Sequence, residues 1–170
     1  MLVVFSMMLF NLADKSDYTE VVIDWLFAMW GNKVNCNRTF WSSWVKSSLS
    51  KTDIPQTYIA LEGANLIATF SLWRCDLQSR QDIFPWFGGL IVSENHRNKG
   101  HGILMQFEAL KILRALGYRE IHLFTDIVGY YEKTGWVFVE EIPDETGKMV
   151  RLYNRSTEIP LLLNKGEFYG

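Results

Sequence analysis

The sequence predicts an α+β sandwich, in which helices cover a single mixed sheet whose strands are mostly antiparallel. Three observations support this fold class. The 170 residues are 48% apolar and 21% charged, which is typical of one globular domain and fits a single unit over residues 1–170. About six or seven segments have strand character and about four are helical. The segment 86–125 has the strand–helix–strand order expected of a right-handed parallel crossover.

The charge and cysteine content exclude several classes of protein. Seventeen lysines and arginines against nineteen aspartates and glutamates give a net charge of −2, which argues against a general nucleic-acid binder. Cys36 and Cys75 are too few for a disulfide scaffold, so we expect buried, reduced thiols in a cytoplasmic protein. The apolar run 1–10 lacks a preceding positive charge and is about half as long as a membrane span. We therefore expect a buried first strand there, and neither a membrane nor a nucleic-acid partner.

Two helices are expected after this strand. In residues 15–30 the apolar side chains recur at helical spacing, and Gly31 ends the pattern. Three side chains can cap the start of that helix: Asp14, Ser16 and Asp17. A shorter helix is expected over 38–49. Both segments are rich in aromatic residues, which at this spacing usually belong to a core: Trp25, Trp30, Phe40, Trp41 and Trp44.

Strand signals dominate the middle of the chain. Segments 57–61 and 66–73 flank the glycine-containing turn 62–65, which predicts a hairpin. The polar stretch 74–84 is expected to be a loop, either solvated with local Asp–Arg pairing or adding charge to a nearby site. Strand 86–93 is nearly all apolar and should lie centrally in the sheet. Its two glycines, Gly88 and Gly89, indicate a bulge or a close approach of another backbone or ligand.

The remaining segments complete the expected order of elements. Gly117 is a suitable end for the helix that precedes the next strand. The tail 155–170 contains an apolar run without a clear period, and it could cover a sheet edge or pair with a second subunit. The expected elements are a helix over 102–116, a strand over 121–125, a short helix over 128–134, and a hairpin of strands 136–140 and 149–153.

The junction between strand 86–93 and helix 102–116 carries the main chemical signal. Glycines there allow a tight turn and a close backbone approach, and the first amides of a helix point outward unpaired. Helix dipole and basic side chains together favour a phosphate or pyrophosphate. A Walker loop is absent, and a dinucleotide fingerprint lacks its last glycine. By itself the segment could also be a turn with incidental basic residues; it comprises Arg97, Asn98, Lys99, Gly100, His101 and Gly102.

With the motifs around it, this region resembles the GNAT superfamily of acetyl-coenzyme A-dependent N-acetyltransferases. The resemblance covers roughly residues 85–142, with the motifs in order and at the expected spacing. It implies the GNAT αβα sandwich, with a central pair of splayed strands. The matching segments are Leu90-Ile91-Val92, the glycine-containing turn, the helix end at 116–118, strand 121–125, and the Tyr-Glu-Lys-Thr-Gly-Trp run at 131–136.

The resemblance also implies roles for individual residues. The backbone of strand residues 90–92 would contact the pantetheine arm, the amides of 97–102 would hold the pyrophosphate, and a bulge near Gly88-Gly89 would splay the strand. The acetyl thioester would lie in that opening, and Tyr131 would protonate the departing thiolate. Thr125 and Lys133 complete the implied coenzyme-binding set, and no metal is implied.

These features predict a small cytoplasmic N-acetyltransferase acting by direct attack in a ternary complex. The acceptor would be a small-molecule or peptide primary amine, and the chain would act as a monomer or homodimer. The aromatic residues between 25 and 44 would border the acceptor, either as core or as a wall of its pocket. Asp126 and Glu62 remain open as general bases, and none is assigned. The alternatives are a non-catalytic acyl-coenzyme A-binding module and a site for a nucleotide phosphate.

Overall fold

The computed structural model describes residues 7–32 and 36–158. Their strands form one sheet in the order β1-β2-β3-β4-β5-β7-β6, in which β4 and β5 are the parallel neighbours. The predicted α+β sandwich with a mostly antiparallel sheet is therefore confirmed. The strands are β1 (Met8–Asn11), β2 (Gln56–Glu62), β3 (Asn65–Trp73), β4 (Trp86–Val92), β5 (Glu120–Thr125), β6 (Val137–Pro143) and β7 (Met149–Ser156).

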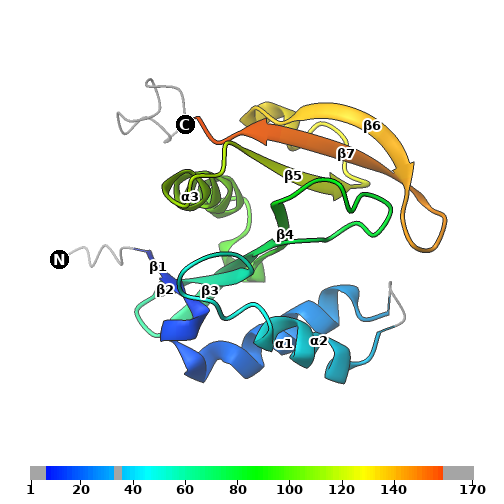
Figure 1. The fold of residues 1–170 in the computed structure, drawn as a ribbon. Coiled ribbons are helices and arrows are strands. Elements are labelled where there is room, and N and C mark those ends of the chain that lie inside the picture. The colour runs from blue at the N-terminus through cyan, green and yellow to red at the C-terminus, as the bar shows by residue number, and fades with distance from the viewer. Residues whose placement is uncertain (1–6, 33–35, 159–170) are drawn as a thin grey trace.

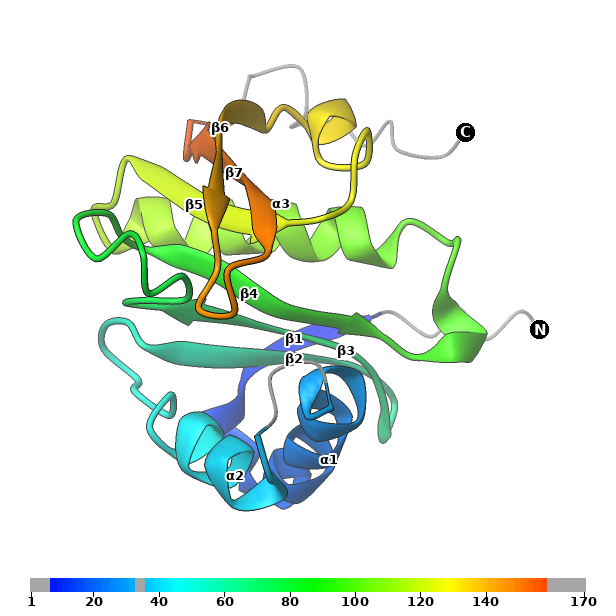
Figure 2. The same cartoon turned by 90° about the vertical axis from the view of Figure 1, so that its right-hand side faces the viewer.

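Helices cover both faces of this sheet. The α-helices are α1 (Thr19–Trp30), α2 (Arg38–Lys46) and α3 (His101–Ala115). Figures 1 and 2 show α3 on one face of β4, and α1 with α2 on the other. The alternation along β5 follows this arrangement, since Ile121 and Leu123 lie in the core beneath α3 while His122 packs against Trp86 on the opposite face.

The helix boundaries differ from the prediction at the start of α1. Two 3-10 turns, Leu12–Asp14 and Ser16–Tyr18, precede it, and its N-cap is Tyr18 without a side-chain hydrogen bond. The expected caps Asp14, Ser16 and Asp17 are therefore wrong, because the chain enters the helix through a tighter turn. Helix α2 ends at Lys46, three residues before the predicted end, and Asn37 caps its start by accepting from the Phe40 amide at 2.9 Å.

The predicted short helix over 128–134 is also wrong, since only the 3-10 turn Glu132–Thr134 forms there. Gly129 adopts a left-handed φ of 80° and interrupts any α-helix at its first turn. Ile127 and Val128 are 52% and 69% exposed, so this segment has no buried apolar stripe to stabilise a helix.

Three further expectations concern the cysteines and the ends of the chain. Cys36 and Cys75 form no disulfide in the described part of the chain, and both are half-buried where full burial was predicted, because each lies on a connecting segment. Residues 155 and 156 of the predicted tail belong to β7, and residues 159–170 lie outside the described residues, as do 1–6 of the expected first strand. None of the described helices has the length and apolar character needed to span a bilayer.

A bulge in β4 is the irregularity that shapes the centre of the sheet. The register with β3 passes from Ile91, opposite Thr69, to Gly88, opposite Ser71, so β4 carries one extra residue there. Gly89 has a φ of 61°, which is readily adopted only by glycine. A Cβ on Gly88 would collide with the ring of Trp73 and would lie 2.8 Å from Oδ2 of Asp76. The predicted bulge is confirmed, and both glycines are needed for it.

We expect Gly88→Ala to destabilise the protein by about 1–3 kcal/mol, because the added methyl group overpacks against a buried tryptophan ring. Equilibrium urea unfolding measures this loss. The double variant Gly88→Ala/Trp73→Leu should lose less stability than the sum of the losses in the two single variants, since the smaller side chain at 73 relieves the collision. Additive losses would show that the contact with Trp73 is not the cause.

Candidate functional site

Strands β4 and β5 are paired at one end and separate beyond it. They form a single pair, Trp86 with His122, supported by a hydrogen bond of 2.9 Å from the His122 amide to the Pro85 carbonyl. Among the described residues no later position of β4 pairs with β5. Strand β4 nevertheless stays paired with β3 as far as Val92, and β5 stays paired with β7 as far as Thr125. Figure 1 shows the two strands diverging, so the β5-facing backbone edge of β4 has no strand partner beyond Trp86 among the described residues. We call the region between the two diverging strands the opening.

The turn after β4 ends in the first turn of α3 with its amides unpaired. Gly100 is the N-cap in a left-handed conformation with φ 80°, and Asn98 has φ 59°. The Arg97 amide donates to Glu94 and the Leu104 amide donates to Gly100. Within the described chain, the amides of 98–103 donate to no acceptor. Unpaired donors at the positive end of this 15-residue helix are free to accept an anion, as the sequence predicts.

Side-chain contacts hold this turn against the neighbouring hairpin. Ser93 Oγ lies 2.7 Å from His96 Nδ1, and His96 Nε2 lies 3.5 Å from Glu62 Oε2 on the end of β2. The Arg97 side chain donates from Nε to the Val92 carbonyl at 3.1 Å. The turn is therefore fixed without using its amides. Glu62, one of the two open candidates for a general base, contacts a histidine beside the anion site.

The turn that carries the unpaired amides also carries basic and imidazole side chains. Arg97 and Lys99 are exposed, whereas His101 and Gly102 are half-buried. The rings of His96 and His101 lie 6.0 Å apart. Burial lowers the pKa of His101, and the nearby His96 and Lys99 lower it further. A bound anion would oppose all three effects.

The other predicted coenzyme contacts lie on both sides of the opening. Leu90 and Val92 pack towards the core beneath α3, and Ile91 packs towards α1 and α2. The side chains of these three residues therefore leave the β5-facing backbone edge of the strand uncovered. Thr125 ends β5, and its Oγ1 accepts from the Ile127 amide at 3.0 Å. Lys133 is exposed in the 3-10 turn that follows. The structure thus brings strand 90–92 and turn 97–102 together, and places Thr125 and Lys133 on the β5 side.

Tyr131 and its neighbour Tyr130 point in different directions. Tyr131 packs against Trp136 and Tyr153, with ring centroids 6.0 and 6.5 Å away. Its hydroxyl has no hydrogen-bond partner in the part of the chain that the structure describes. Burial raises the pKa of Tyr131, and Tyr130 adds to this, so the phenol stays protonated at neutral pH. The Tyr130 hydroxyl instead lies beside the first turn of α3, 2.7 Å from where a Cβ on Gly102 would be.

Aromatic rings extend from α2 to the β4 bulge. Phe40, itself 40% exposed, lies 5.4 Å from Trp44, which lies 5.4 Å from Trp73 between ring centroids. Trp73 in turn packs against Gly88 and Gly89. We call Phe40, Trp44 and Trp73 the aromatic wall. The indole N–H groups of Trp44 and Trp73 are buried without a hydrogen-bond partner among the described residues. The sequence predicted Phe40 and Trp44 on α2 as core or as a pocket wall, but it did not indicate the role of Trp73.

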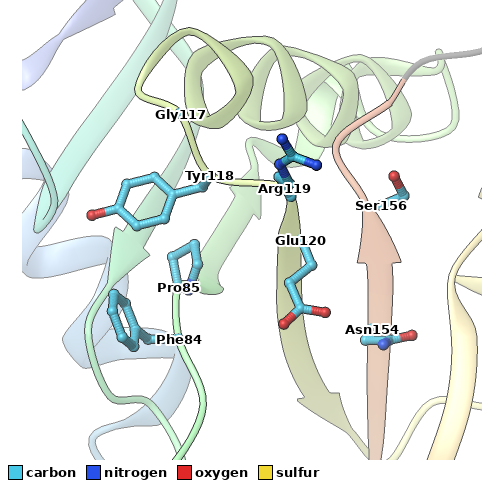
Figure 3. Close-up of a pocket in the computed structure, with 8 residues that line it drawn as sticks. All are labelled: Phe84, Pro85, Gly117, Tyr118, Arg119, Glu120, Asn154 and Ser156. Atoms are coloured by element: carbon cyan, nitrogen blue, oxygen red, sulfur yellow. The ribbon is translucent and has the colours of Figure 1, made fainter.

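A hollow of about 570 Å³ at the other end of the splayed strands is not this site. Figure 3 shows it between the segment leading into β4, the residues after α3 and the end of β7. Because a helix of 15 residues is about 22 Å long, the hollow lies far from the unpaired amides at the start of α3. Its lining residues are Phe84, Pro85, Gly117, Tyr118, Arg119, Glu120, Asn154 and Ser156. Among the described residues, no three histidine, cysteine or acidic side chains gather as a metal site requires.

The same fold occurs in solved acetyltransferases, although no protein-family profile and no curated protein matches the sequence. An aminoglycoside 6′-N-acetyltransferase bound to coenzyme A superposes with a TM-score of 0.70 at 14% identity, covering 91% of this chain and 98% of that one. A GNAT-family acetyltransferase from Streptococcus pneumoniae gives 0.63 at 18% identity, covering 89% and 99%. A spermidine N-acetyltransferase chimera from Vibrio cholerae gives 0.67 at 15% identity, covering 89% and 95%. The chain therefore has the GNAT fold, as its motifs predict.

We expect inorganic pyrophosphate to bind with a pH dependence that His101 contributes. The pKa of His101 is lowered in the protein without a ligand, and a bound anion would raise this pKa. Binding is therefore coupled to protonation of His101 and strengthens as the pH falls. Calorimetry measures the ratio of the affinity at about pH 5.5 to the affinity at about pH 7.5. This ratio should be up to about tenfold larger in wild type than in His101→Asn. Comparing the two proteins cancels the titration of pyrophosphate itself. Equal ratios would place the anion away from this turn.

Proposed function

We propose that this chain is an N-acetyltransferase that moves the acetyl group of acetyl-coenzyme A to a primary amine. The observation that carries the proposal is the row of unpaired amides at the start of α3, beside the free edge of β4. Diphosphate oxygens are strong acceptors and would satisfy these donors. The GNAT fold and the coenzyme A complex of one structural neighbour support this choice of donor substrate.

The residues present fit coenzyme A along the length of the opening. Amides 98–103 would hold the diphosphate, and the side chains of Arg97 and Lys99 would add charge around it. The β5-facing edge of Leu90, Ile91 and Val92 offers backbone groups to the amide-containing pantetheine arm. Thr125 and Lys133 would contribute from the β5 side. No metal is needed for this binding.

The proposed chemistry is direct attack of a neutral amine on the thioester carbonyl within a ternary complex. The oxyanion that develops needs a fixed donor, which a free amide of the β4 edge can supply. The departing thiolate needs a proton, and Tyr131 is the proposed source, because its hydroxyl is protonated and unpartnered among the described residues. Structural neighbours act on aminoglycosides and spermidine, which favours a small-molecule amine here, with a peptide amine as the alternative.

The experiment that tests the function follows release of the coenzyme A thiol from acetyl-coenzyme A in the presence of a panel of amines. We expect release that depends on at least one amine, and an acetyl-coenzyme A-induced rise in melting temperature larger than that from ATP or NAD. A rise without any acetyl transfer would instead favour an acyl-coenzyme A-binding module. A larger rise with ATP or NAD would favour a nucleotide-phosphate site.

Tyr131→Phe should lower kcat by about 100-fold or more, because it keeps the packed ring and removes the proton donor. Acetyl-coenzyme A should still raise the melting temperature of this variant as it does that of the wild type. Tyr130→Phe is the matched control, and it should retain most of the wild-type kcat. An unchanged kcat in Tyr131→Phe would remove the acid role from this residue.

A further inference from the structure

The loop between β3 and β4 is anchored to the protein at Leu77, although most of its residues are exposed and Arg80 pairs with Asp82 as expected of a solvated connection. Leu77 is fully buried and belongs to an apolar cluster with Trp73 and Trp86. The loop is closed by hydrogen bonds from the Arg80 amide to the Leu77 carbonyl at 3.0 Å and from the Trp86 indole to the Ile83 carbonyl at 2.9 Å. These contacts fix the position of Asp76, which directly precedes Leu77.

The Asp76 carboxylate lies against the bulge of β4. Its Oδ2 is 2.8 Å from where a Cβ on Gly88 would be, a contact that only glycine permits. In the described part of the chain it has no hydrogen bond and no ion pair. The nearby cations are engaged elsewhere, since Arg74 lies 3.7 Å from Asp53 and Arg80 lies 2.8 Å from Asp82.

The groups that face this carboxylate favour its protonated form. Burial is the larger cause, and the like charge of Glu145, from the turn between β6 and β7, is the second; together they raise the pKa of Asp76 to about 7. Cys75, the preceding residue, has a raised pKa, through burial and then through Asp76 itself. A carboxylate that titrates near neutral pH and lacks a partner suits proton acceptance.

We infer that Asp76 is the general base of the proposed reaction, taking a proton from an acceptor ammonium that reaches the β4 bulge along the aromatic wall. This inference rests on the proposed function, since the bulge borders the opening assigned to the thioester. The exposed Phe40 ring and the half-buried Trp44 ring, together with the carboxylate, favour as acceptor a primary ammonium on an apolar or cationic body, because aromatic faces attract cations and pack against apolar groups. Asp76 lies on a connecting loop, apart from both Asp126 and Glu62.

The proton balance of the reaction is complete without a further reactant. Asp76 takes one proton from the ammonium, and the neutral nitrogen then forms a bond to the thioester carbon. As the carbon–sulfur bond breaks, its electron pair stays with sulfur. The nitrogen loses its second proton as the amide forms, which balances the proton that Tyr131 gives to the thiolate. Asp76 releases its own proton to solvent, so each turnover yields amide, free thiol and one proton.

Melting temperature as a function of pH tests the titration of Asp76 without any substrate. A folded-state pKa near 7, against 3.8 for the ordinary group, means that wild-type stability falls as the pH rises from about 4 to about 7. The melting temperature of Asp76→Asn should therefore exceed that of wild type by a margin that grows over this interval and is constant above it. Asp76→Ser, which also lacks a titrating group, should show the same trend. A margin independent of pH would overturn the inference.

Acetyl transfer as a function of pH tests the catalytic role. Wild-type kcat/KM for the amine should rise through about pH 7, and Asp76→Asn should lower it by about 100-fold or more and lose that inflection. The thermal shift caused by acetyl-coenzyme A should be unchanged. Asp82→Asn is the control from the same loop, and because its pKa is lowered by Arg80, it should keep both the rate and the inflection.

The outcomes separate this inference from the proposed function. If wild type transfers acetyl and Asp76→Asn keeps its rate and inflection, Asp76 is not the base while the acetyltransferase assignment stands. If wild type binds acetyl-coenzyme A and acetylates no amine, the proposed function fails and the base assignment falls with it. Loss of rate in Asp76→Asn with an unaltered inflection would show a structural role and would also overturn the inference.

Discussion

The site depends on one constraint, which is that β4 must stay paired with β3 while leaving β5 after a single residue. Register with β3 continues on both sides of the bulge, from Trp86 to Val92, whereas pairing with β5 stops at Trp86. The extra residue at Gly88-Gly89 lets both conditions hold, because a bulge bends a strand and increases its twist without breaking its ladder. A strand without those glycines would meet the Trp73 ring and would have to move away from β3.

The same constraint positions the groups at both ends of the opening. At its far end β4 runs directly into the turn that begins α3, so the divergence of the strands and the direction of the helix amides are set by one continuous segment. At the bulge, the missing side chain of Gly88 leaves the space against which Asp76 lies. The unpaired amides at the start of α3 thus lie beyond one end of β4, and the unpaired Asp76 carboxylate lies near the other end.

Much of this could be predicted from local sequence. Apolar periodicity located the sheet and α3, paired glycines indicated the bulge, and the run 97–102 located the turn whose amides are unpaired, because each signal lies within a few residues. The start of α1 and the segment 128–134 were mispredicted, since exposed apolar residues and a left-handed Gly129 decide the latter in three dimensions. Asp76 could not be identified, because its character depends on the packing of its buried neighbour Leu77 and on contact with a glycine twelve residues later.

Unsatisfied polar groups at the two ends of β4 are costly for a fold that could have avoided them. A side-chain cap on α3 would satisfy part of the amide row, and an asparagine at 76 would remove a carboxylate whose ionised form is disfavoured by burial. The same loop pairs another carboxylate with a cation, since Arg80 and Asp82 form a close ion pair that begins four residues after Asp76. Under the proposed function, an anion at the α3 end and a cation at the bulge would pair with these unsatisfied groups. This polarity sets the direction in which donor and acceptor substrates would approach one another.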